Sequence, residues 1–195
     1  MNPLYIIPTP IGNLEDITVR SLNILKNSDL ILCEDTRRTS KLLNHYSIKK
    51  KLISFHKDNE LIMINKVLDL LKTNVISLVS DAGTPTISDP GSKLVKKLYS
   101  NGMQVIPLPG PSSITTAFSA SGLEGDFIFV GFLPKNLKSL IKNLINLSQI
   151  NKNLILFESP KRIMRLIDES RKIFKNSNLI IFKELTKINE KIIYL

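Results

Sequence analysis

The chain has 195 residues, which is enough for one large domain or two small ones. Hydrophobic residues make up 43% and charged residues 23%, a balance typical of globular proteins that excludes a disordered chain. The net charge of +10 favours a polyanionic partner, with nucleic acid first and a membrane surface second. Lys, Asn and Ile are overused together, as base-composition bias would also produce, so the charge is supporting evidence only.

The sequence predicts neither a membrane segment nor a disulfide. No apolar run approaches the about 18 residues that span a bilayer, and the N-terminus lacks the basic region of a signal peptide. Cys33 is the single cysteine, which excludes an intrachain disulfide and a zinc site built on cysteines. It lies in an apolar run, where a small buried side chain is expected. A reducing cytoplasm is the simplest location.

Strands and helices are expected to alternate along the whole chain, which is the pattern of an α/β protein. Asp16 offers an N-cap for the first helix. The glycines of segment 122–126 mark a boundary between an N-terminal α/β domain, 1–121, and a smaller C-terminal α/β domain, 127–195, which looks incomplete. Short apolar runs predict the strands, at 4–7, 30–33, 52–55, 75–79, 104–107, 127–130, 154–157, 179–182 and 190–195.

The segment 80–91 is the most informative stretch and reads S-D-A-G-T-P-T-I-S-D-P-G. It follows a predicted buried strand and precedes a predicted helix, so it lies at the carboxyl edge of the sheet, where ligands bind in α/β proteins. An ordinary connection of this kind has about 2–6 residues. The greater length, with its glycines, prolines and polar side chains, favours a functional loop over a simple connection.

Three further loops are expected at the same edge, at 8–13, 34–39 and 108–113. Neither G-x-G-x-x-G nor a P-loop motif is present, so dinucleotide and triphosphate sites are not supported. No histidine–carboxylate cluster predicts a catalytic metal. The residues alone therefore indicate a two-lobed α/β protein that binds a small polar metabolite, and they leave nucleic-acid binding open.

Seven motifs stand in order along the whole chain. They are L-Y-I-I-P-T-P-I-G-N-L-E-D-I-T at 4–18, E-D-T-R-R-T at 34–39, S-D-A-G-T-P-T-I-S-D-P-G at 80–91, P-L-P-G-P-S-S at 107–113, G-F-L-P at 131–134, F-E-S-P-K-R at 157–162 and K-E-L-T-K at 183–187. Together they resemble the bacterial 16S ribosomal RNA (cytidine-2′-O)-methyltransferases, a family of tetrapyrrole-methylase type. The resemblance implies S-adenosylmethionine-dependent methylation of a cytidine ribose in the decoding region of the small ribosomal subunit. It also implies a two-lobed fold with the cofactor between the domains, and a homodimer.

The resemblance also implies which residues form the site. A base must take the proton of the ribose hydroxyl, or else positioning alone supplies the rate, and the sequence leaves both possibilities open. The expected cofactor contacts are Ile11, Ala82, Gly83, Thr84, Ile87, Ser112, Ser113 and Phe157. The available carboxylates are Glu34, Asp35 and Asp81, and the expected RNA contacts are Arg37, Arg38 and Lys135.

Two departures from the family keep other functions open. The segment 135–139 carries fewer cations than its counterpart in the family, and the family continues beyond Leu195. One alternative is therefore a degenerate module that binds RNA without catalysis. Another is a methylase acting on a small tetrapyrrole, which the ribosomal type of the motifs at 36–38 and 80–83 disfavours.

Overall fold

The computed structural model describes residues 2–195, which form two compact units. The first unit runs to Ser113 and includes Thr186–Ile188, whereas Ile114–Leu185 and Asn189–Leu195 form the second. The segment 122–126, predicted as the linker, lies within the second unit. Helix α5, Ser113–Ser119, goes with that unit because the Phe118 ring packs on Phe127, with 4.5 Å between centroids.

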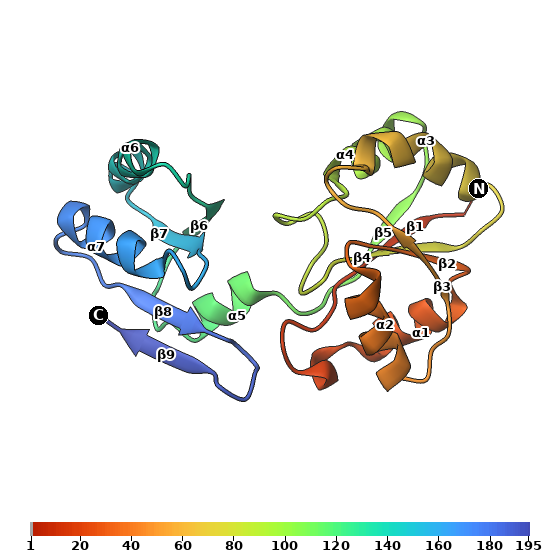
Figure 1. The fold of residues 1–195 in the computed structure, drawn as a ribbon, viewed down its shortest axis with the longest axis horizontal. Coiled ribbons are helices and arrows are strands. Elements are labelled where there is room, and N and C mark those ends of the chain that lie inside the picture. The colour runs from red at the N-terminus through yellow and green to blue at the C-terminus, as the bar shows by residue number, and fades with distance from the viewer. Residues whose placement is uncertain (1) are drawn as a thin grey trace. The chain divides into compact units, whose positions relative to one another are not determined.

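The first unit is a parallel sheet of five strands in the order β3-β2-β4-β1-β5 (Figure 1). Every pairing in this sheet is parallel, so all five strands end at one edge. Helices connect successive strands, as the sequence predicts for an α/β protein. The elements are β1 Leu4–Ile7, η1 Leu14–Asp16, α1 Val19–Asn27, β2 Leu30–Cys33, α2 Thr36–His45, β3 Lys51–Ser54, α3 Glu60–Leu70, β4 Ile76–Val79, α4 Ser92–Ser100 and β5 Val105–Pro107.

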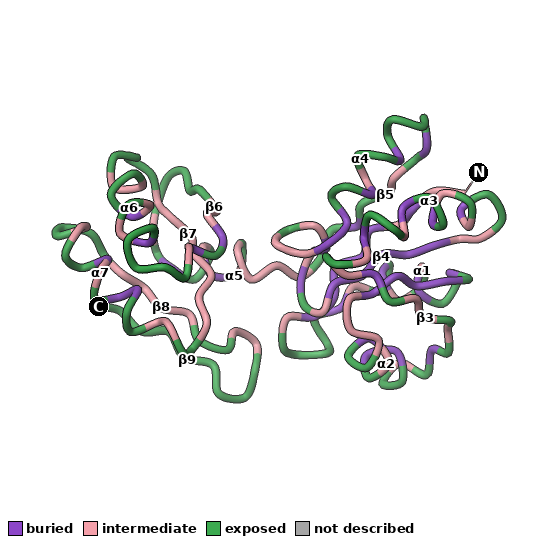
Figure 2. Tube along the Cα trace, turned by 45° about the horizontal axis from the view of Figure 1, so that its top comes forward, coloured by how far each residue is buried: buried purple, intermediate pink, exposed green. Residues whose placement is uncertain are grey.

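Both faces of this sheet are buried, which explains why β2 is an unbroken apolar run and β4 is apolar apart from the small, buried Ser77 (Figure 2). Side chains alternate along β2. Leu30 and Leu32 join the core beneath α3 and α4, whereas Ile31 and Cys33 join the core beneath α1 and α2. Cys33 is fully buried, as predicted for a small apolar side chain. The alternation places helices on both sheet faces and leaves only the strand ends open to a ligand.

The second unit is a smaller α/β unit with two separate pairs of strands. Strands β6 and β7 pair in parallel, and β8 and β9 form an antiparallel hairpin. Its core consists of buried leucines between the β6–β7 pair and two helices. Within residues 2–195, every helix falls short of the length and apolar character needed to cross a membrane. The remaining elements are β6 Phe127–Phe132, α6 Leu137–Ser148, β7 Asn153–Phe157, α7 Ile163–Ile173, β8 Ile180–Lys183 and β9 Lys191–Tyr194.

The first helix begins later than the sequence predicts. Asp16 lies in the short η1 turn, and Thr18 caps α1 because its Oγ1 accepts a hydrogen bond of 3.0 Å from the Ser21 N–H. Threonine is an effective N-cap, and Ile17 between the two candidates is buried. The prediction of Asp16 as the cap was therefore wrong by two residues.

Helix α4 is capped by a residue from a different helix. Gly91 stands at its N-cap with φ of 122°, and a side chain there would meet Leu78, with 2.7 Å between the added Cβ and Leu78 Cδ2. The missing cap is supplied by Glu60 at the start of α3. Its Oε1 accepts hydrogen bonds from the N–H groups of Gly91 at 3.0 Å and Lys93 at 3.1 Å. This buried carboxylate fixes the end of the 80–91 loop.

Replacing Glu60 should loosen that loop and destabilise the first unit. In Glu60→Ala, buried N–H groups at the start of α4 lose their acceptor, so we expect the free energy of unfolding to fall by about 2–3 kcal/mol. Urea unfolding followed by circular dichroism measures this change. Glu15→Ala, at an exposed position, is the control, and equal losses in both variants would contradict the capping role.

Candidate active site

The carboxyl ends of the five parallel strands gather the predicted loops along one edge of the first unit. Strands β4 and β1 lie side by side near the middle of the sheet, with β2 and β5 as their other neighbours. The loops 8–13 and 80–91, which follow β1 and β4, are therefore adjacent. In an open α/β sheet this is the position where ligands bind.

Backbone hydrogen bonds join these two loops in a short antiparallel bridge. The Thr9 N–H donates to the Gly83 carbonyl at 2.9 Å, and the Gly83 N–H donates to the Thr9 carbonyl at 2.8 Å. The side chains of Thr9 and Ser80 are buried and bond to backbone carbonyls of the same segment, at 3.0 and 2.8 Å. The start of the 80–91 loop is thus held in one conformation.

The loop after β5 packs against the same bridge. The Thr84 hydroxyl donates to the Pro111 carbonyl at 3.2 Å. A Cβ added to Gly110 would lie 2.8 Å from the Cβ of Pro8, so only glycine allows the 108–113 and 8–13 loops to approach this closely. A Cβ on Gly83 would lie 3.4 Å from Ile11 Cγ2. The structure therefore brings together the predicted cofactor residues of three loops.

The remaining predicted cofactor residues have less uniform surroundings. Ala82 is exposed and Ile87 is 42% exposed, so both present apolar surface at the edge. Ser112 and Ser113 are half-buried at the start of α5. Phe157 ends β7 in the second unit, where its ring packs on Phe129 with 4.8 Å between centroids. These contacts are with other aromatic rings of the same unit, so the role of Phe157 in cofactor binding stays a prediction.

The charged loop after β2 is bonded to the loop after β4. The Asp35 N–H donates to Asp81 Oδ1 at 3.0 Å, and Arg38 forms an ion pair of 3.4 Å with Asp81. Arg37 forms two hydrogen bonds to the Asp35 carboxylate, at 3.0 and 2.7 Å. The Arg37 side chain, bonded in this way, holds the pKa of Asp35 well below its usual range. Asp35 is therefore a poor proton acceptor, and its carboxylate mainly caps α2 and orients Arg37.

Asp89 is a carboxyl group that the sequence analysis did not select. Burial, followed by the negative charge of Glu34, raises its pKa to about 6; Lys57 opposes this shift and Asp81 adds to it. Asp89 therefore lies in the field of two of the carboxylates that the motifs indicated. A pKa close to neutral suits a general base. In the sequence, the one signal was the crowding of polar residues in the 80–91 loop, which does not reveal burial.

The predicted RNA contacts fall into two groups. Arg37 and Arg38 have exposed side chains, yet each is paired with an aspartate of the edge. Lys135 lies in the second unit, is exposed, and forms no ion pair with any residue that the structure describes. The first group thus carries compensated charge and the second carries free charge.

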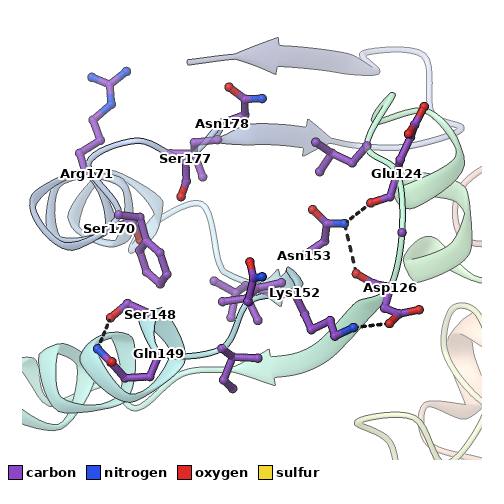
Figure 3. Close-up of a pocket in the computed structure, with 18 residues that line it drawn as sticks. Glu124, Asp126, Ser148, Gln149, Lys152, Asn153, Ser170, Arg171, Ser177 and Asn178 are labelled. Atoms are coloured by element: carbon purple, nitrogen blue, oxygen red, sulfur yellow. Dashed lines mark hydrogen bonds and ion pairs between the residues drawn. The ribbon is translucent and has the colours of Figure 1, made fainter.

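A pocket of about 800 Å³ in the second unit contains none of the predicted site residues (Figure 3). Its lining comes mainly from 123–126, 148–154 and 170–179. The polar groups there satisfy one another: Asn153 Nδ2 donates to the carbonyls of Glu124 and Asp126, at 2.8 and 3.1 Å, and Lys152 pairs with the Asp126 carboxylate. The described residues, 2–195, hold no cluster of three or more metal-ligating side chains. The predicted site residues of the first unit therefore lie at the sheet edge, and this pocket contains none of them.

Comparison with known proteins agrees with the family indicated by the sequence motifs. Residues 3–194 match the model of the Tetrapyrrole (Corrin/Porphyrin) Methylases. Relatives named "Ribosomal RNA small subunit methyltransferase I" include one from Thermotoga maritima, 46% identical over 98% of this chain and 86% of its own length. Another, from Halalkalibacterium halodurans, is 45% identical over 96% of this chain and 66% of its own length. A third, from Hydrogenobaculum, is 46% identical over 97% of this chain and 84% of its own length. The chain therefore belongs to the tetrapyrrole methylase family, in the group of the small subunit ribosomal RNA methyltransferases I.

Proposed function

We propose that this protein transfers a methyl group from S-adenosylmethionine to the ribose 2′-hydroxyl of a cytidine in 16S ribosomal RNA. The observation that carries the proposal is the 45–46% identity to ribosomal RNA methyltransferases over almost the whole chain. The motif resemblance extends it to a cytidine in the decoding region of the small subunit, to a homodimer and to the cytoplasm. The names of the relatives favour this proposal over the catalytically degenerate module and the small-molecule methylase.

The residues at the edge of the first unit fit S-adenosylmethionine. Ile11, Ala82 and Ile87 offer apolar surface for an adenine ring, and the bridged backbone at Gly83 is rigid enough to position it. The carboxylates along the same edge favour a cation such as a sulfonium. When bound, S-adenosylmethionine supplies a methyl group activated by that positive sulfur. Ser112, Ser113 and Thr84 would add polar contacts, and Phe157 is included on the motif resemblance alone.

The chain itself must supply a group that accepts the proton of the ribose hydroxyl. Among Glu34, Asp35 and Asp81, Asp35 is bound twice by Arg37, and Asp81 accepts the Asp35 N–H. Within the described residues no hydrogen bond engages the Glu34 carboxylate, and its charge helps to raise the pKa of Asp89. Asp89, assisted by Glu34, is therefore the base that we favour. Asp81 and Asp35 position the loop and its arginines.

The proposed activity is tested by methyl transfer to small ribosomal subunits that lack the modification. We expect tritium from labelled S-adenosylmethionine on one cytidine ribose, and calorimetry should detect binding of S-adenosylmethionine by the protein alone. The relative from Thermotoga maritima serves as the positive control. Failure of transfer where the relative succeeds would contradict the enzyme proposal, and RNA binding without cofactor binding would indicate the degenerate module.

Replacing Asp89 should change both stability and the pH dependence of the reaction. Because the folded state raises this pKa, folding takes up protons between about pH 4 and 6, and stability falls as the pH rises through that window. Asp89 is only half-buried, so solvent screening reduces the effect; Asp89→Asn should raise the free energy of unfolding at pH 8 by about 1–2 kcal/mol and flatten the dependence between about pH 4 and 6. Methyl transfer should fall by about a hundredfold or more, with unchanged cofactor affinity.

Asp58→Asn is the matched control for this change, because the Asp58 side chain is 97% exposed. It should alter neither the stability profile nor the rate. If Asp89→Asn retains full activity while it stabilises the fold, the carboxyl group is structural and the base lies elsewhere.

Arg37→Ala should weaken RNA binding and leave cofactor binding intact. The substitution removes one positive charge from the edge and leaves the Asp35 carboxylate without its partner, so RNA phosphates meet added repulsion. We expect the slope of log affinity against log salt to fall by about one unit. Filter binding across a salt titration measures it. An unchanged slope would exclude Arg37 from the RNA contacts.

A further inference from the structure

Two loops of the second unit lie side by side because the strands before them pair in parallel. The partners at the ends of β6 and β7 are Phe132 and Phe157. The segment 133–136 follows the first strand, and the segment 158–162 follows the second. The loops after both strands therefore emerge at the same edge, just as the loops of the first unit do.

A buried ion pair fixes these two loops to each other. The Glu158 side chain is 4% exposed, and Arg162 binds both of its oxygens, at 2.7 and 2.5 Å. Burial alone would raise the pKa of Glu158, but the hydrogen bonds from Arg162 and the Ser159 N–H hold it below its usual value. The same guanidinium donates to the Leu133 carbonyl at 3.0 Å. Arg162 therefore connects the loop after β7 to the loop after β6.

A second arginine, one helical turn further along α7, adds another connection. Arg165 donates to the Lys135 carbonyl at 3.0 Å. The backbone on either side of Pro134 is thus bonded to the beginning of α7 at two points. The Lys135 backbone is thus fixed to Arg165, and Lys161 directly precedes Arg162 in the connected loop; the side chains of Lys135, Lys161 and Arg165 are all exposed.

The charge of this surface has little compensation. The segments 133–138 and 158–165 together contain five Lys and Arg residues and one carboxylate, Glu158, which is already occupied by Arg162. The next carboxylates along α7 are Asp168 and Glu169; among the described residues neither forms an ion pair with Arg165, and Glu169 pairs with Lys172. Among the residues that the structure describes, Lys135, Lys138, Lys161 and Arg165 form no ion pair, unlike Lys172, which pairs with Glu169. We call the four unpaired cations the basic face.

At the edge of the first unit the balance is the opposite. Arg37 and Arg38 are paired with Asp35 and Asp81, and Glu34 and Asp89 add further negative charge to that edge. A phosphate approaching these loops meets more carboxylates than cations. The basic face meets the phosphate with free cations on a braced loop, which is the arrangement that favours backbone binding.

We propose that the basic face binds the sugar–phosphate backbone of the RNA substrate and that the Glu158–Arg162 pair positions it. This inference rests on the proposed function, which supplies RNA as the partner. It assigns most of the RNA affinity to the second unit, leaving recognition of the reacting nucleotide to the first. Lys161, Arg165 and Lys138 were not among the RNA contacts expected from the motifs.

The test compares two triple variants of the full chain that remove equal charge from the second unit. The face variant carries Lys135→Ala, Lys161→Ala and Arg165→Ala, and the control variant carries the corresponding changes at Arg171, Lys172 and Lys175, all exposed. Filter binding of small-subunit RNA across a salt titration should show a slope reduced by about two to three units in the face variant and by less than about one in the control. Cofactor affinity should be unchanged in both.

Each outcome decides a separate question. Equal slope changes in the two variants would mean that the general positive field binds RNA, and would overturn the proposal. Selective loss of binding to vesicles containing phosphatidylserine, with RNA affinity intact, would overturn it in favour of a membrane surface. If the wild-type chain neither binds RNA nor transfers methyl, the proposed function itself fails. Should the face variant unfold, the double variant Lys135→Ala, Lys161→Ala removes two lysines that have no ion-pair partner among the described residues and tests the same slope.

Discussion

The pair of backbone hydrogen bonds between Thr9 and Gly83 is the constraint on which the active edge depends. Two loops rich in proline and glycine have few side chains that can pack on one another, so their conformation must come from the backbone. The bridge supplies it, and the buried hydroxyls of Thr9 and Ser80 complete the pairing. At the far end of the 80–91 loop, the Glu60 carboxylate at the start of α3 accepts a hydrogen bond from the Gly91 N–H and fixes the backbone there. The loop is held at both ends, which leaves its middle to face a ligand.

The first sheet could be predicted from the sequence because burial on both faces forces its strands to be apolar runs. Which polar residue caps a helix was harder to predict. Asp16 and Thr18 are both good caps, and only the folded chain shows that Asp16 lies in η1 while Thr18 accepts the Ser21 N–H. The cap that Glu60 provides for α4 could not be predicted at all, since the two partners are thirty-one residues apart. The boundary near 114 was hidden for a similar reason, because α5 is assigned by its contact with β6.

At the site, too, the motifs predict which residues are present, whereas their hydrogen bonds and pKa values depend on packing. The motifs identify the loops and the carboxylates Glu34, Asp35 and Asp81, but they do not say which carboxylates are engaged by neighbours. That depends on the Arg37 fork and on the Asp35 N–H, which arise when β2 and β4 become adjacent. Asp89 emerges only after folding, because its burial and the nearby charge of Glu34, which raise its pKa, exist only in the folded chain. A sequence motif identifies a carboxylate, but its protonation and its hydrogen-bond partners depend on the residues that surround it in the folded chain.

The two units differ in the charge of their exposed loops. A methyl donor that is cationic at sulfur and an RNA that is anionic throughout make opposite demands on a surface, and one set of loops cannot meet both well. In the first unit, arginines at the edge are paired with aspartates, so the edge as a whole remains acidic. In the second unit, the carboxylate between the two connected loops, Glu158, is buried and bound by Arg162. Separating the two demands between units would let each surface keep the sign that its proposed partner needs, with the proposed RNA contacts on the loop at Lys135.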